Sequence, residues 1–389
     1  MNSYRVARIG FDTIIMAFRA RLPVDLAEQL TQARMQARET RSPIPFALGR
    51  GEIPGEVLSH GVQGGYDTVF STGELGEMWQ FKTDQKGDKW PLRMKIRAGA
   101  LLAHGYPDAA NFAMERLIGF KIPIEDARLS EVHVCIDILT DAEFRLDESC
   151  LIRPGRSVVR PYEALDQDHP LLDEDVPSEV QRILRGNRLE TLCIGSRKTG
   201  SQTIIYDKRS EATIRRNRMF FEAYGLDCND RKWRLWRNEC RFSGPVLKRN
   251  FRVRTFEDLG TRARDMVEWA TDRVRYAAPG QEHMHPSRRT IAPYWRAVRS
   301  AIPLLSAPLP SLIPPARAQE ILDREKKEAL EAAAVGAITT HAAMSGANAE
   351  TILKELPDRA ASLVRHRLRR SSDRVLENFE RAAKLHTKR

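Results

Sequence analysis

Residues 189–211 read LETLCIGSRKTGSQTIIYDKRSE, and this stretch predicts two strands joined by a turn. The first half alternates and is apolar, the middle holds Gly200 with polar side chains and two cations, and the second half is rich in β-branched residues. Apolar runs bounded by Gly and Ser are typical of a β-hairpin. Tyr206 shares a strand face with Ile204, and with Lys208 if the strand continues. A phenol beside a lysine suits chemistry on phosphate, although Tyr is also common in ordinary half-buried strands.

Residues 130–139, SEVHVCIDIL, alternate strictly between an aliphatic face and a polar one. The polar face carries Glu131, His133, Cys135 and Asp137. Side chains on one face of a strand recur every second residue, so these groups form a row. Carboxylates and imidazole are metal-ligand types. The pattern is therefore that of a metal-binding strand or of a strand with one solvated face.

Residues 233–242, WRLWRNECRF, alternate in the same way. Arg237, Glu239 and Arg241 occupy one face, and Trp236, Asn238, Cys240 and Phe242 occupy the other. A glutamate between two arginines is a salt-bridged structural acid or a metal ligand held by cations. Taken alone, the pattern favours the salt bridge.

The composition is that of a soluble globular protein with two or three domains: 389 residues, 30% charged and 42% hydrophobic. No apolar run is long enough for a membrane span. Asp12 and Arg19 interrupt the apolar stretch near the N-terminus, which argues against a signal peptide. Five scattered cysteines without a C-x-x-C motif indicate a reducing cytoplasm.

The net charge of +11 is concentrated in two blocks. Residues 208–254 hold fourteen Lys/Arg against five Asp/Glu, and residues 359–389 hold ten against three. Concentrated positive charge indicates polyanion binding. Solvated helix faces are the alternative, more so for the C-terminal block.

The order of segments predicts an α+β protein with a central, mainly antiparallel sheet that carries the site on one face and helices on the other. Four regions are expected: an N-terminal α+β region (1–125) that serves DNA recognition and forms a second sheet, a catalytic domain (126–301), a proline-rich linker (302–315) and a basic helical region (316–389). Residues 42–65 read as a loop, and residues 210–225 and 255–276 read as helices.

Three of these blocks together resemble the transposon-type replication initiation factor family, which comprises rolling-circle initiators of staphylococcal plasmids and relaxases of integrative conjugative elements. The blocks are VHVCIDI, GSRKTGSQTIIYDKRSE and WRNECRF, within residues 130–242. The resemblance implies a fold like that of HUH endonucleases. It also implies an enzyme that nicks and rejoins one DNA strand through a 5′-phosphotyrosine.

The resemblance assigns roles to individual residues. Tyr206 falls on the nucleophile, Lys208 and Glu211 fall on the family's trailing lysine and acid, and Asp137 and Glu239 fall on acidic positions associated with a divalent metal. The family usually has an acid where this chain has His133, and imidazole suits Mn²⁺ or another first-row metal as a third ligand. Mg²⁺ or Mn²⁺ is the expected cofactor. The residues expected to bind flanking phosphates are Arg197, Lys198, Arg237 and Arg241.

The expected partners are origin DNA, single-stranded or cruciform at the nick site, a host helicase and a second copy of the chain. Three other interpretations stay open. The chain is a non-catalytic DNA-binding protein on the same scaffold, a conjugative relaxase instead of a replication initiator, or a metal-dependent hydrolase that forms no covalent adduct.

Overall fold

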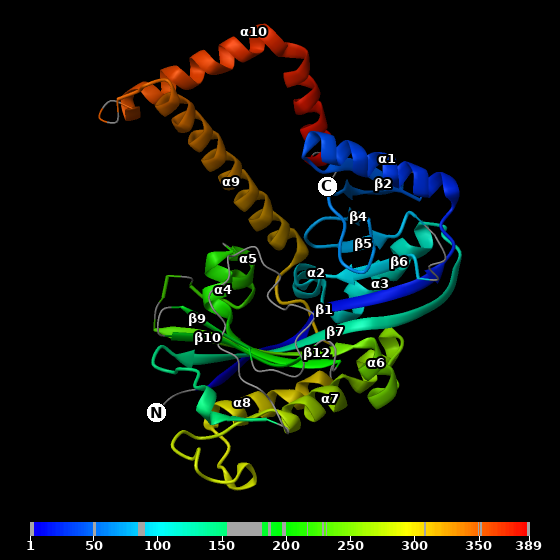
Figure 1. Cartoon of the computed structure of the whole chain (residues 1–389), viewed down its shortest axis with the longest axis vertical. Coiled ribbons are helices and arrows are strands. Elements are labelled where there is room, and N and C mark those ends of the chain that lie inside the picture. Colours follow the sequence, from blue (N-terminus) through cyan, green and yellow to red (C-terminus); the bar gives the residue numbers. More distant parts are fainter. Residues whose placement is uncertain are drawn as a thin grey trace. The chain divides into compact units, whose positions relative to one another are not determined.

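The computed structural model (Figure 1) divides into two compact units, Met1–Pro315 and Ala316–Arg389. Each unit is described by itself. The structure describes residues 4–49, 52–84, 90–153, 181–185, 188–196, 200–215, 217–227, 229–230, 232–306, 309–348, 350 and 352–386.

The first unit is built on one antiparallel sheet of eleven strands. The strand order is β2-β3-β4-β5-β6-β1-β7-β12-β11-β10-β9. The bounds in that order are Ile44–Leu48, Ile53–Val57, Thr68–Ser71, Glu77–Phe81, Leu92–Ile96, Arg5–Ala20, Ile124–Asp141, Trp233–Ser243, Ser201–Asp207, Arg188–Ser196 and Gln181–Arg185. A separate small sheet pairs β8 (Leu151–Ile152) with β13 (Arg275–Tyr276).

Strands β1 and β7 are the longest and lie side by side at the centre of the sheet. Most of β1 is buried, as expected for a central strand with a nearly continuous apolar sequence. Because β1 pairs with both β6 and β7, it joins the N-terminal strands to the rest of the sheet. The expected second sheet is therefore wrong: the N-terminal strands extend the main sheet.

The hairpin expected in residues 189–211 is present as β10 and β11. Two glycines beside the turn have positive φ: Gly195, near the end of β10, with 89°, and Gly200, just before β11, with 84°. A Cβ on Gly195 would lie 2.4 Å from the Ser201 carbonyl oxygen, so no other residue fits there without a shift. Strand β11 ends at Asp207, whose carboxylate accepts a hydrogen bond from the Ser210 amide at 2.9 Å and caps the next helix.

Helices α7 (Phe256–Arg273) and α8 (Pro293–Ala301) lie on one side of the sheet, and α4 (Lys208–Ile214) and α5 (Arg218–Ala223) lie on the other (Figure 1). The aliphatic face of β7 belongs to the same buried core as α7 and α8. Phe242 of β12 contacts Trp269 of α7, and Tyr294 of α8 donates a hydrogen bond to Asn238 at 3.0 Å. The polar face of β7 and β12 is left on the side of α4 and α5.

Two details differ from the sequence-based expectations. The expected loop at 42–65 contains the β2–β3 hairpin, because cross-strand pairing overrides the low strand propensity of Pro and Gly. The expected helix at 210–225 is two helices, since Asn217 starts α5 by accepting a hydrogen bond from the Phe220 amide. Helix α7 is capped by Thr255, with Asp258 as the reciprocal partner of a capping box.

The remaining helices of the first unit flank the N-terminal strands and close the α7–α8 layer. They are α1 (Val24–Thr40), α2 (Ala98–His104), α3 (Tyr106–Gly119), the short α6 (Gly244–Val246), and the irregular turns Glu148–Cys150, Leu247–Phe251, Pro286–Arg288 and Ile302–Ser306.

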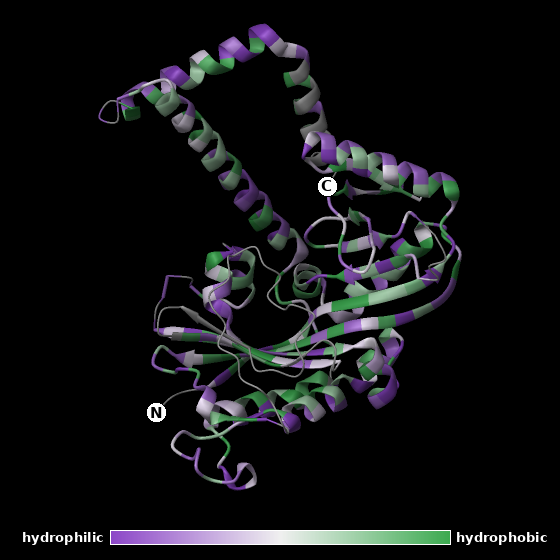
Figure 2. Cartoon of the chain, viewed as in Figure 1, coloured by the Kyte–Doolittle hydropathy of each residue, from purple (hydrophilic) through white to green (hydrophobic). Residues whose placement is uncertain are grey.

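The second unit consists of two long helices, α9 (Pro315–Met344) and α10 (Ile352–His386). Hydrophilic residues recur along both (Figure 2). Ser371 has non-helical backbone angles and divides α10 into two stretches. None of the described helices combines the length and the apolar composition that a membrane span requires.

Candidate functional site

The polar faces of four neighbouring strands meet on one side of the sheet. The register places Tyr206 of β11 opposite Arg237 of β12, and Arg237 opposite Asp137 of β7. It also places Arg241 opposite His133. Residues that pair directly across strands project to the same face. The three sequence blocks singled out above are thereby brought to one place.

Tyr206 donates a hydrogen bond from its hydroxyl to Glu239 Oε2 at 3.1 Å. Its side chain is partly exposed, whereas Glu239 is only 2% exposed. Burial, and then the negative charge of Glu239, raise the pKa of Tyr206 well above its ordinary value. The phenol is therefore protonated at neutral pH, and its proton already points at a carboxylate.

Glu239 uses its other oxygen for two cationic partners. Oε1 lies 2.7 Å from Arg241 Nε and 3.1 Å from His133 Nδ1. Burial opposes ionisation, but Arg241 and His133 together lower the pKa of Glu239 well below its ordinary value. The carboxylate is therefore ionised and can accept a hydrogen bond or hold a cation.

His133 is held between two carboxylates. Its Nε2 lies 2.6 Å from Glu131 Oε1, while Nδ1 faces Glu239. Burial lowers the pKa of His133, but the hydrogen bonds to Glu131 and Glu239 outweigh it, and the net shift is upward. A carboxylate on the far nitrogen of a histidine is the usual device that fixes the tautomer and the ring orientation of a metal ligand. Glu131 thus aims Nδ1 at the centre of the site.

Asp12, His133 and Glu239 form a group that could hold a metal ion. Each offers one ligand atom, and these atoms all lie within 4.8 Å of one another. Two carboxylates and one imidazole suit a hard or borderline divalent ion such as Mn²⁺ or Mg²⁺. The orienting contact from Glu131 supports the same interpretation, so the residues present fit a divalent metal.

Asp12 reaches this group because of a β-bulge. Phe11 pairs with Val134 and Thr13 pairs with His133, although Val134 and His133 are neighbours in the sequence. Asp12 is therefore the extra, unpaired residue of β1. A bulge twists the strand locally and redirects a side chain, and bulges are common next to active sites.

A buried chain of polar groups continues from Asp12. Arg237, only 1% exposed, contacts Asp12 through Nη1 and binds Asp137 with Nε at 2.7 Å and Nη2 at 2.8 Å. Asp137 is fully buried and also accepts a hydrogen bond from the Tyr224 hydroxyl. Burial lowers the pKa of Arg237, but the negative charge of Asp137 and the further acids around it outweigh this, and the net shift is strongly upward. Arg237 thereby fixes the position of the Asp12 carboxylate.

Lys208 and Glu211 lie at the start of α4, beside Tyr206. Lys208 Nζ is 2.7 Å from Glu211 Oε2 and 5.8 Å from the centroid of the Tyr206 ring. It also lies 5.0 Å from the centroid of Phe220.

The structure thus brings Tyr206, Glu239, His133 and Lys208 together. On β7, the residue that faces Glu239 across the strands is Cys135. Asp137 lies two residues further along β7, where it binds Arg237. Arg197 and Lys198 lie outside the described residues.

Of the two expected phosphate-binding residues on β12, the Arg241 side chain is 21% exposed, whereas Arg237 is buried against two acids. The sequence did not point to three site residues: Asp12, Glu131 as an orienting group, and Tyr224. The signal for Asp12 was present, as an acid inside an apolar strand.

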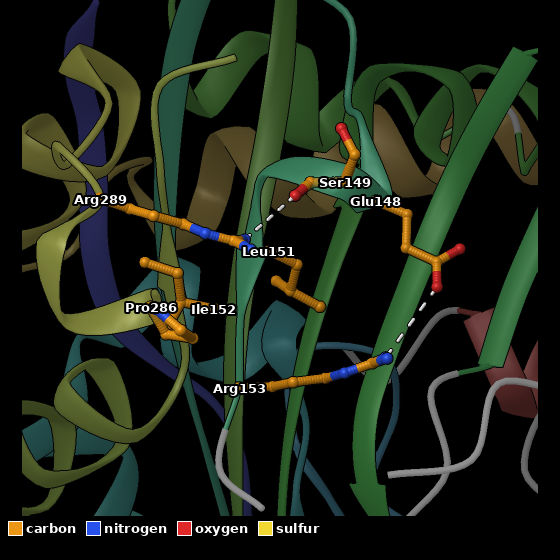
Figure 3. Close-up of a pocket in the computed structure, with 7 residues that line it drawn as sticks. All are labelled: Glu148, Ser149, Leu151, Ile152, Arg153, Pro286 and Arg289. Atoms are coloured by element: carbon orange, nitrogen blue, oxygen red, sulfur yellow. Dashed lines mark hydrogen bonds and ion pairs between the residues drawn. The ribbon is translucent and has the colours of Figure 1, made fainter. Parts of the chain in front are cut away.

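A cavity of about 540 Å³ lies away from this group, around β8 (Figure 3). Arg289 reaches the Ser149 carbonyl at 3.5 Å, and Arg153 lies 3.9 Å from Glu148. Its two arginines are thus turned toward groups of the cavity wall. None of the residues of the Tyr206–Glu239 site lines it.

No protein-family model matches the chain, and no curated protein matches its sequence. Among solved structures, the chain is similar to the rolling-circle replication initiator protein from Geobacillus stearothermophilus, with a TM-score of 0.40 and 11% sequence identity. The similarity covers 79% of this chain and 100% of that one. It is distant, and the function proposed below depends on the residues of the site instead.

Proposed function

We propose that this protein is a metal-dependent enzyme that nicks and rejoins one strand of DNA through a 5′-phosphotyrosine on Tyr206, as an initiator of rolling-circle replication. The observation that carries the proposal is the hydrogen bond of 3.1 Å from the Tyr206 hydroxyl to Glu239, a member of the Asp12–His133–Glu239 group. The motif resemblance of the three strands gives independent support.

The residues divide the reaction among them. The phenol oxygen becomes strongly acidic as Tyr206 Oη bonds to the phosphorus, and Glu239 Oε2, which already holds its hydrogen bond, accepts the proton in the same step. The bond from phosphorus to the 3′ oxygen breaks, which leaves a 5′-phosphotyrosine, and Lys208 supplies the proton for the departing 3′-hydroxyl. In rejoining, a 3′-hydroxyl attacks the phosphotyrosine, Tyr206 leaves, and both protons return. The covalent link conserves the phosphodiester, so rejoining needs no ATP.

Charge stabilisation is the other requirement of phosphoryl transfer. Asp12, His133 and Glu239 would hold a divalent ion, which acts as a Lewis acid on the scissile phosphate when bound. Arg241, partly exposed at the edge of this group, is suited to a flanking phosphate. A conjugative relaxase would use the same site and the same reaction, so this role remains the alternative within the proposal.

Detection of the adduct tests the proposal. The chain is incubated with Mn²⁺ and a single-stranded oligonucleotide that carries the origin of its own genetic element. Mass spectrometry of the tryptic peptides should find a nucleotide-phosphate adduct on Tyr206. Tyr206→Phe should abolish both the adduct and nicking, and excess EDTA should do the same to the unaltered chain.

The matched control is Tyr66→Phe, which removes a phenol hydroxyl that is bonded to the Trp90 carbonyl, away from the site. It should nick normally. Cleavage by the Tyr206→Phe chain, or cleavage without any adduct, would overturn the proposal; the second outcome would favour a metal-dependent hydrolase.

A further inference from the structure

Helix α10 carries a cluster of cations in its first stretch. Residues 359–370 contain five arginines and one histidine, and no Asp or Glu occurs between Asp358 and Asp373. Every residue from 365 to 370 is exposed. A local positive charge of this density is costly to keep without an anion nearby, which makes the segment different from an ordinary mixed-charge helix surface.

Most of these cations are gathered on one face, and Arg367 lies outside it. At 100° per residue, Arg365, His366, Arg369 and Arg370 fall within one arc of the helix, and Val364 and Leu368 fall on the opposite arc. We name the arc of Arg365, His366, Arg369 and Arg370 the basic face of α10. Spacings of three and four residues put these side chains next to one another along the helix.

The arginines of the basic face are available for a partner. Arg359, which precedes the first residue of the basic face by six positions, forms an ion pair with Glu355 at 2.7 Å. Among the described side chains, Arg365, Arg369 and Arg370 have no carboxylate partner. Arg365 makes one hydrogen bond, to the Ala361 carbonyl of its own helix at 3.3 Å. Their guanidinium groups are thus free to meet an external anion.

We propose that the basic face of α10 binds the phosphate backbone of duplex DNA, as a contact separate from the nicking site. Arginine is well suited to phosphate, because its planar fork donates two parallel hydrogen bonds. The inference uses the proposed function only in taking DNA as the polyanion. It adds a surface that binds duplex DNA, in addition to the site at which Tyr206 would cut one strand.

Two other partners fit the face less well. Proteins that hold single-stranded DNA stack its bases on aromatic side chains, and residues 352–378 contain no Phe, Tyr or Trp. Helices that lie on membranes keep an uncharged apolar arc opposite the basic one, whereas here Arg367 lies beside Val364 and interrupts that arc. Binding to the phosphate backbone of a duplex requires only regularly spaced cations on the protein.

The test is the salt dependence of duplex binding by the full chain. A fluorescent duplex of arbitrary sequence is titrated at several salt concentrations, and the slope of log affinity against log salt is compared between variants. Each phosphate contact contributes about 0.9 to that slope. The variant Arg365→Gln/Arg369→Gln/Arg370→Gln should therefore lower the slope by about 2 to 3. Gln keeps a helix propensity near that of Arg, which circular dichroism checks.

The matched control is Arg324→Gln/Lys326→Gln/Lys327→Gln on α9. These three exposed cations are interspersed with Asp323, Glu325 and Glu328, and the variant loses the same net charge. Its slope should change by less than about 1 unit. Equal changes in both variants, or no change in either, would overturn the proposal.

Two further binding measurements, with phosphatidylserine vesicles and with single-stranded DNA, would identify a different partner. Loss of binding to phosphatidylserine vesicles, with duplex binding unchanged, would assign the face to a membrane and refute the proposal. A loss confined to single-stranded DNA would refute it as well. The measurement requires no cleavage and is repeated with the Tyr206→Phe chain, so its outcome is independent of the nicking mechanism.

Discussion

Replacing Asp137 by asparagine tests the buried chain of polar groups that positions Asp12. The Asp137 and Arg237 side chains are 0% and 1% exposed, and two hydrogen bonds of 2.7 and 2.8 Å join them. Removing one partner of a buried ion pair costs about 3–5 kcal/mol when the other charge is left without a partner, and because Arg237 keeps its contact with Asp12, the lower end, about 3 kcal/mol, applies here. Asp137→Asn should therefore lower the free energy of unfolding by about that amount.

The same change should weaken metal binding. Once Asp137 is neutral, the charge of Arg237 is balanced mainly by Asp12, so Arg237 competes more strongly with a metal for that carboxylate. Changes behind a metal ligand typically cost ten- to a hundredfold in affinity. Because Asp137 acts on Asp12 through Arg237, we expect about a tenfold loss of Mn²⁺ affinity.

Urea unfolding in EDTA measures the first effect, and calorimetric titration with Mn²⁺ measures the second. A double-mutant cycle with Arg237→Met separates the pair from its surroundings. The double variant should be less destabilised than the two single variants summed, because each single variant already breaks the Asp137–Arg237 pair and the sum counts that loss twice. A loss of less than about 1 kcal/mol for Asp137→Asn, or unchanged Mn²⁺ affinity, would refute this account of Arg237.

Two further predictions concern pH and the hairpin. The raised pKa of His133 means that its protonated form stabilises the metal-free fold below the ordinary histidine pKa, and that this contribution is lost as the pH rises through the higher folded pKa. Mn²⁺ affinity should rise with pH, because His133 must lose its proton to bind the metal: about tenfold per pH unit below the folded pKa, and no further above it. A Mn²⁺ affinity that stays constant between about pH 6 and 9 would contradict this. Gly195→Ala places a Cβ 2.4 Å from the Ser201 carbonyl at a φ of 89°, so it should cost about 1–3 kcal/mol in urea unfolding, and an unchanged midpoint would show that the turn can relax.

The sequence determined the local parts of this protein. Strict alternation in residues 130–139 and 233–242 separated a polar face from an apolar one before any partner strand was known. Glycines 195 and 200 marked the hairpin that carries Tyr206, because only glycine adopts such turns without strain. The two basic blocks were also visible directly, since charge is a property of composition.

The tertiary structure decided which of these residues meet. Asp12 joins His133 and Glu239 because a bulge in β1 redirects its side chain, and these partners lie on β7 and β12, more than a hundred residues away along the chain. Asp137 and Arg237 became a buried pair through the register of β7 with β12. Bulges and registers depend on pairing between distant segments, and no local pattern encodes that pairing.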